Sequence, residues 1–218
     1  MTEPLLAPSF LFRFSVPCRR LKTPWTAKGI DLDAAYGIPS FGELEGRPLF
    51  AELRMGWDPA GLAFCLRVVG KSQTAWCRES RIEDSDGLRL WIDTRDTHNI
   101  HRASRFCHQF AFLPAGGGNL QKAPVARRLT IHRARENPKP TGDGLLRCVS
   151  ESFHDGYELR GWIAADAMTG YDPNEHPRLG FCYAVIDRQF GWQTFSLGPD
   201  FPIEEDPSLW GTLELADS

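Results

Sequence analysis

Apolar and polar residues alternate with a period of two over many short segments of this chain. Leu88, Leu90 and Ile92 occupy every second position of one segment, so in a strand their side chains point to the same face. The same alternation recurs at 106–113, where His108 and Gln109 are placed on opposite faces. This period predicts β-strands with two different faces rather than amphipathic helices.

About ten segments have this strand pattern, and turns rich in glycine and proline separate them. Pro17 is expected to end the first strand, DPAG at 58–61 to join the second and third in a hairpin, and 164–168 to form one helical turn. Many short strands with very little helix predict an all-β chain, a single antiparallel β-sandwich domain over 1–218. We expect it to be jelly-roll-like, with two sheets as in the immunoglobulin fold. The expected strands are 9–16, 49–57, 62–69, 87–94, 106–113, 126–134, 145–153, 157–163, 178–187 and 211–215.

The composition indicates which binding partners and which cellular location to expect. The formal net charge is −3 with no strongly basic stretch, so nothing favours a nucleic-acid partner. No apolar run approaches the ~20 residues of a membrane span, so no membrane partner is expected. Glu3, Pro4 and Pro8 interrupt the N-terminal apolar residues, which argues against an export signal and for a cytoplasmic location. The 6 cysteines form no C-x-x-C pair and are expected to be free thiols.

Metal and catalytic chemistry find little support in the residue spacing. His98 and His101 form an H-x-x-H on a polar loop, which is not a zinc pattern, so no metal site is predicted. Calcium is the one cofactor that the acidic residues leave open, although they do not form a D-x-D-x-D-G loop. These residues are Glu83, Asp84, Asp86, Asp93 and Asp96. No nucleophile motif is present, and the sequence places no two carboxylates at the spacing that glycoside hydrolysis needs. We therefore expect a protein that is not an enzyme, with a hydrolase as the weaker alternative.

Several motifs occur in an order and spacing that resemble the family 9 carbohydrate-binding modules and the wider DOMON-like β-sandwich group. The resemblance covers about 10–215. The segments that carry it are LRMGWDPAGLAFCLRVVG, DSDGLRLWIDTRD, HQF, FHDGYELRGWIAADAM, PRLGFCYAVID and DPSLWGTLEL. In the sugar-binding members of this family, two tryptophans clamp a terminal sugar ring and nearby polar side chains bind its hydroxyls.

The resemblance implies candidate site residues in this chain. Trp76, on a polar loop, matches the first clamp tryptophan in order along the chain, and Trp192 is the candidate for the second. The alternative for both is a structural tryptophan that packs against the sandwich. The polar candidates are Arg105 and Gln109 at the start of a strand and His101 and Arg102 on the loop before it. Arg105 and Gln109 are four residues apart, so in a strand both would face the same groove. The alternative for these is an ordinary solvated loop.

Two functions of different class follow from these observations. The first is a non-catalytic binding module for a saccharide, which the motif order and Trp76 favour. The second is an intracellular interaction or scaffold protein that has the same fold and no sugar site. The lack of an export signal, the cysteines and the lone domain favour this second hypothesis.

Overall fold

A computed structural model describes residues 8–140 and 142–217. Twelve strands and six short 3-10 helices are found in this part of the chain. The strands are β1 (Ser15–Arg20), β2 (Gly37–Ile38), β3 (Ala51–Asp58), β4 (Gly61–Val68), β5 (Gly87–Asp93), β6 (Cys107–Gly117), β7 (Ala123–Leu129), β8 (Leu146–Phe153), β9 (Gly156–Ala164), β10 (Arg178–Asp187), β11 (Gly191–Thr194) and β12 (Gly211–Ala216). The 3-10 helices are η1 (Pro8–Leu11), η2 (Ala34–Tyr36), η3 (Phe41–Glu45), η4 (Glu79–Asp84), η5 (Ala165–Ala167) and η6 (Pro207–Leu209). None of the described helices is long and apolar enough to span a membrane.

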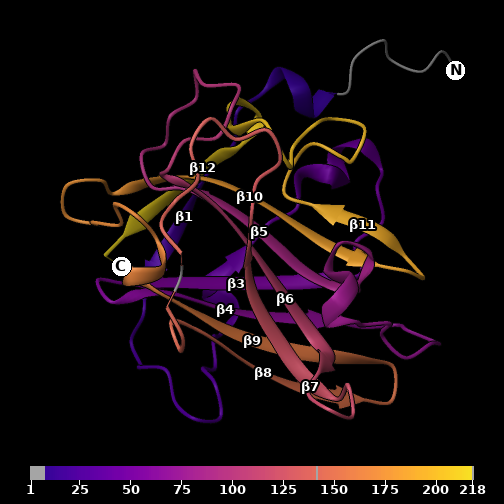
Figure 1. Ribbon diagram of the computed structural model, residues 1–218. Helices are drawn as coiled ribbons and strands as arrows, with labels where there is room; N and C mark the ends of the chain where they lie inside the picture. The colour runs from indigo at the N-terminus through magenta and orange to yellow at the C-terminus, as the bar shows by residue number, and fades with distance from the viewer. Residues whose placement is uncertain (1–7, 141, 218) are drawn as a thin grey trace, which may run out of the picture.

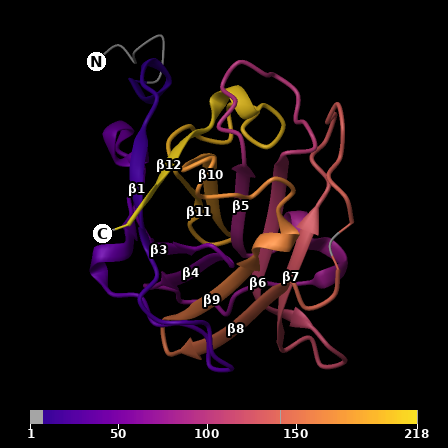
Figure 2. The same ribbon diagram turned by 90° about the vertical axis from the view of Figure 1, so that its left-hand side faces the viewer.

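The strands follow one hydrogen-bonded path in the order β7-β6-β5-β10-β12-β1-β3-β4-β9-β8, with β11 on β10 and β2 on β3. Strands β5, β6 and β10 lie across β3, β4, β9 and β8, so the path folds over itself into two layers (Figures 1 and 2). Strands β7 and β8, the two ends of the path, contact each other. The sandwich is therefore nearly closed into a barrel, and the predicted all-β sandwich with very little helix is confirmed.

The N-terminal strand differs from its prediction in position and direction. The expected strand at 9–16 is replaced by η1 and then β1, which begins at Ser15 and pairs in parallel with both β12 and β3. Pro17 lies inside β1, where β12 pairs with it, whereas β3 pairs only from Arg19 onward. Proline has no N–H to donate, and it is tolerated here because only one neighbouring strand pairs with Pro17. The described sheet is thus antiparallel except at β1.

The two central strands β5 and β6 have one face toward the core between the layers, and their other face is covered as well, since every residue of β5 and nearly every residue of β6 is buried. Leu88 lies opposite Phe112, and Leu90 lies opposite Phe110, all fully buried. The Phe112 ring also packs edge-on against Phe64 of the second layer, with 4.7 Å between centroids. Each such side chain contributes about 1.5–3 kcal/mol by burial. Because of the period of two, Arg89 and Gln109 must lie on the opposite, outer face.

The predicted hairpin between β3 and β4 is present, and its sequence explains its geometry. Asp58 Oδ1 accepts a hydrogen bond from the Ala60 N–H at 2.8 Å, and Asp58 pairs with Gly61. Gly61 has φ +151°, and a Cβ there would lie 2.1 Å from the Ile163 carbonyl oxygen of β9. Glycine is therefore required where this hairpin meets the neighbouring strand.

All 6 cysteines are free thiols, as predicted, and five of them are buried. Burial raises the pKa of Cys107 to about 12 and that of Cys182 to about 12. These thiols act as small apolar core side chains and are poor nucleophiles at neutral pH.

Candidate functional site

A pocket of about 560 Å³ lies on the outer face of β5, β6 and β11. Strand register explains which side chains reach it. Arg89 pairs with Ala111, two residues from Gln109, so Arg89 and Gln109 share a face. On the other side of β5, Arg89 pairs with Ala184 of β10, and Trp192 of β11 lies opposite Ile186, two residues further along β10. The sheet thereby brings Gln109 and Trp192 into one pocket although they are far apart in sequence.

Gln109 forms part of the floor of this pocket. Only 8% of its surface is exposed, and none of the hydrogen bonds within the described residues uses its side-chain amide. The amide nitrogen and oxygen are not among the buried polar atoms that lack a partner, so solvent reaches them from the pocket. Its donors and acceptor are therefore available to a molecule that enters the pocket.

Arg89 is the second polar group of the floor and is 1% exposed. Its guanidinium donates to the backbone carbonyls of Leu88 at 3.3 Å and Ser85 at 3.2 Å, and also to that of Ile82. Burial lowers the pKa of Arg89 to about 10, while the charges of Glu204 and Glu83 oppose this shift. The guanidinium is thus a fixed positive charge beneath the pocket, held mainly by the protein's own carbonyl groups.

The rim combines an aromatic ring with carboxylates. Trp192 is half-buried, whereas Glu83 and Glu204 are exposed. Among the described residues neither of these two carboxylates forms an ion pair. Glu205, by contrast, pairs with His132 at 2.7 Å. A flat apolar ring beside fixed hydrogen-bonding groups is the combination that suits a sugar, which has apolar C–H faces and hydroxyl edges.

Trp76 lies outside this pocket and is covered by arginines. Its half-buried ring has the Arg188 guanidinium 4.2 Å from the ring centroid, with those of Arg81 at 5.6 Å and Arg78 at 5.7 Å. These cation–π contacts occupy ring surface that a stacked sugar would need. Trp76 and Trp192 line no common pocket among those found in the described chain.

A buried ion-pair cluster holds the loop that carries Trp76. Lys71 Nζ lies 3.4 Å from Asp86 Oδ2 and also pairs with Asp187. Asp86 in turn accepts hydrogen bonds from the backbone N–H groups of Trp76 at 3.0 Å and Arg188 at 2.8 Å. All three charged side chains are almost fully buried. The cluster therefore fixes Trp76 and Arg188 relative to each other.

The sequence matches no protein-family model and no curated protein. Solved structures do resemble the chain in shape. The fold is that of the family 9 carbohydrate-binding modules. A module of this family from Caldicellulosiruptor kristjanssonii in complex with cellotriose superposes with a TM-score of 0.59 at 11% identity, covering 94% of this chain and 95% of that chain. A family 9 module from the same organism in complex with glucose gives 0.59 at 12% identity, with coverages of 94% and 97%. A chain from Bacteroides uniformis gives 0.54 at 13% identity, with coverages of 94% and 100%. At such low identity the likeness shows a shared fold and carries no residue roles.

Within the family 9 fold, the remaining predicted site residues lie away from the pocket of Gln109 and Trp192. Arg105 precedes β6, which begins only at Cys107, so the parity expected to bring Arg105 beside Gln109 does not apply. Arg105 instead forms an exposed ion pair with Glu136 at 3.7 Å. Arg102 donates through Nε to the carbonyl of Arg133 at 2.9 Å. These contacts are those of solvated loops.

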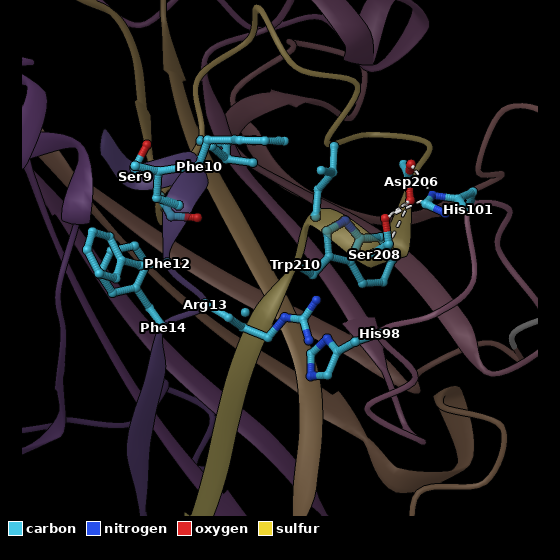
Figure 3. A pocket seen from close by; sticks show the side chains of 15 residues that line it. Ser9, Phe10, Phe12, Arg13, Phe14, His98, His101, Asp206, Ser208 and Trp210 are labelled. Carbon is cyan, nitrogen blue, oxygen red and sulfur yellow. Dashed lines mark hydrogen bonds and ion pairs between the residues drawn. The ribbon is translucent and has the colours of Figure 1, made fainter. Parts of the chain in front are cut away.

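His101 lines a second cleft, of about 470 Å³, between the N-terminal segment and the loop before β12. Figure 3 shows His101 directed at Asp206 and Ser208, with Phe12 and Phe14 on the other side of the cleft. Ser208 Oγ and Asp206 Oδ2 both lie 3.1 Å from the same atom, His101 Nδ1. A catalytic triad needs the hydroxyl and the carboxylate on opposite ring nitrogens, so this trio is not one.

The histidines and cysteine near the central loop do not converge on a metal. Within residues 8–140 and 142–217, no group of three or more His, Cys, Asp or Glu side chains is arranged to hold a metal ion. His98 bonds Thr212 Oγ1 at 3.1 Å, and His108 is buried in the core.

Sequence reasoning missed Arg89 and the two unpaired rim carboxylates. A signal for Arg89 was present, because an arginine interrupts an otherwise apolar strand whose neighbours are all buried. Glu83 and Glu204 gave no such signal. They lie in irregular segments, and only the folded chain brings those segments to the outer face of the sheet.

Proposed function

We propose that this protein is a non-catalytic carbohydrate-binding module that holds a saccharide in the pocket of β5, β6 and β11. The observation that carries the proposal is the Gln109 amide, which lies at the floor of the pocket, where solvent reaches it, and makes no hydrogen bond within the described residues. A ligand in the pocket can replace the water at this amide with hydrogen bonds of its own. Sugar hydroxyls, which both donate and accept, match an amide that does the same.

The other pocket residues have complementary parts in this proposal. The Trp192 ring packs against an apolar face of the sugar, and Gln109 reads a hydroxyl. Arg89 holds a positive charge below the ring and keeps the strand and the η4 segment in register through its bonds to the carbonyls of Ile82 and Ser85. The modules of similar fold in complexes with cellotriose and glucose support a saccharide as the ligand class.

The proposal is tested by titrating the protein with glucose, cellotriose and a panel of other sugars while following tryptophan fluorescence. A saturable change is expected, and Trp192→Ala should weaken the affinity by at least about tenfold, as loss of a central aromatic contact does. Trp25→Ala is the matched control, since Trp25 is also half-buried but lines a different pocket. Equal affinities of the wild type and W192A would refute the site.

The same incubations test the absence of catalysis. A binding module returns cellotriose unchanged, so chromatography of the mixture should show the trisaccharide alone. Release of glucose or a disaccharide at a rate proportional to protein concentration would contradict the non-catalytic part of the proposal.

A protein-interaction module with no sugar site is the second candidate, and one observation favours it. Phe10, Leu11 and Phe12 are consecutive apolar side chains with exposed fractions of 44%, 65% and 63%. Contiguous exposed apolar residues often mark an interaction surface. This candidate predicts that no sugar changes the fluorescence and that replacing these residues with serine alters only association with another protein.

A further inference from the structure

Carboxylates outnumber cations around the pocket of Gln109 and Trp192. Glu83, Glu204 and Glu205 line it together with Arg89 and His132. His132 is engaged by Glu205, and the carboxylates remain in excess even when that imidazole is protonated. The pocket therefore has a surplus of negative charge at its rim.

The positive and negative charges of the pocket lie at different depths. Arg89 is at the floor, where backbone carbonyls hold its guanidinium. Glu83 and Glu204 are at the exposed rim, and each is close enough to Arg89 to influence its charge, yet neither reaches the 4.0 Å of an ion pair. All three residues line the same pocket, of about 560 Å³.

The Gln109 amide is a further polar group that is open to a ligand in this pocket. It is 8% exposed, has no hydrogen-bond partner among the described residues and lines the same pocket. The carboxylates alone would also suit a divalent cation, but the described residues include no His, Cys, Asp or Glu group arranged to hold one. The complement to unpaired rim carboxylates above an amide and a tryptophan is therefore an organic cation that also has hydroxyl groups.

We propose that the pocket prefers a basic amino sugar, of the glucosamine type, over neutral and acidic sugars. This inference rests on the proposed function and specifies its ligand class. The hydroxyls of the sugar meet Gln109, its apolar face meets Trp192, and its ammonium lies between Glu83 and Glu204. A uronic acid would place its carboxylate against the same rim and be repelled.

The test compares glucosamine with N-acetylglucosamine, glucose and glucuronic acid by isothermal titration calorimetry at neutral pH. N-Acetylglucosamine removes the charge of the amine but adds an acetyl group, and glucose, which is uncharged and lacks that group, controls for the added bulk. Two rim ion pairs of ordinary strength predict a preference for glucosamine of about tenfold over both uncharged sugars. The preference should shrink in high salt, because rim charges are screened.

Variants locate the preference. Glu83→Gln and Glu204→Gln should each reduce the ratio of glucosamine to N-acetylglucosamine affinity, and together they should abolish it. Glu175→Gln removes an exposed carboxylate that does not line the pocket and should leave the ratio unchanged.

The outcomes distinguish this inference from the proposed function. Binding of glucose without any preference for glucosamine, or tighter binding of glucuronic acid, overturns the inference and leaves the saccharide site in place. A preference that survives in the double variant also overturns it. No binding of any of the four sugars overturns the inference, and no binding of cellotriose and the wider panel either overturns the proposed function as well.

Discussion

The buried imidazole of His108 should make this protein markedly less stable in mild acid. His108 is fully buried in β6, opposite Ile92, and its ring stacks on Phe110 with 6.0 Å between centroids. Neither ring nitrogen makes a hydrogen bond of normal geometry, although the Thr169 backbone is near enough to favour the protonated ring slightly. Burial, aided by the charge of Arg128, lowers the pKa of His108 to about 4.

The direction and size of the effect follow from proton linkage. In the unfolded chain the pKa returns to about 6.5, so between pH 6.5 and pH 4 the unfolded state binds a proton that the folded state does not. Stability is therefore intact above about pH 6.5 and is lost as the pH falls toward 4. From these two pKa values, the loss attributable to His108 is about 2 kcal/mol at pH 5 and about 3 kcal/mol well below pH 4.

The measurement is urea unfolding followed by tryptophan fluorescence at pH 7.5 and pH 5 for the wild type and His108→Leu. The difference between the two pH values should be smaller in the variant by about 2 kcal/mol, since other titrating groups cancel in the comparison. His154→Leu, at an exposed histidine, serves as the control and should keep the wild-type difference. An H108L difference equal to that of the wild type would refute the argument that His108 is buried neutral.

Two further predictions concern charge and thiol burial. Lys71→Met should lower the unfolding free energy by about 3–5 kcal/mol, because it leaves Asp86 and Asp187 buried without their cation. The control Lys22→Met, at an exposed lysine, should change the unfolding free energy little. A K71M protein as stable as the wild type would contradict the role of the cluster. The native protein should react very slowly with a thiol-specific reagent at neutral pH, because most of its cysteines are buried with raised pKa values, and should react fully after unfolding in urea. Rapid modification of several thiols in the native state would show that the core opens more easily than the structure implies.

The strands that the sequence predicts well are those with a clear two-sided environment. Segment 87–94 alternates cleanly because one face meets the core and the other meets a pocket floor, and β5 occupies almost the same residues. The hairpin at 58–61 is equally clear, because a turn with Gly61 at its end has few alternatives. In both places local pattern and tertiary packing agree.

The N-terminal strand was misplaced because local pattern and packing disagree there. Phe10 and Phe12 alternate as a strand would, yet both are exposed, and the buried positions of β1 are Val16 and Cys18. Parallel pairing of β1 with β12 joins the two ends of the chain, and no local signal in the sequence encodes such a distant pairing.

The candidate site was half predictable. Residue type and motif order made Trp192 and Gln109 candidates, and the fold places both in one pocket, but the four-residue strand β11, which carries Trp192 there, was too short to be predicted. Parity suggested Arg105 as a neighbour of Gln109, whereas the neighbour in the fold is Arg89 on the adjacent strand. Cross-strand register is a property of the assembled sheet, so it could not be obtained from the spacing along one segment.

The proposed saccharide site depends most directly on the Gln109 amide. The contribution of this amide to sugar affinity can be measured alone. Gln109→Leu keeps the approximate size of the side chain and removes its hydrogen-bonding groups. Gln73→Leu is the matched control, because Gln73 is exposed and outside the pocket.

The decisive measurement is calorimetric titration of the wild type, Q109L and Q73L with the same sugar, at equal protein stability confirmed by thermal unfolding. The account predicts that Q109L binds about threefold to tenfold more weakly, the value of one lost hydrogen bond to a neutral group, and that Q73L binds as the wild type does. Equal affinity of Q109L and the wild type would contradict the claim that this pocket is the saccharide site.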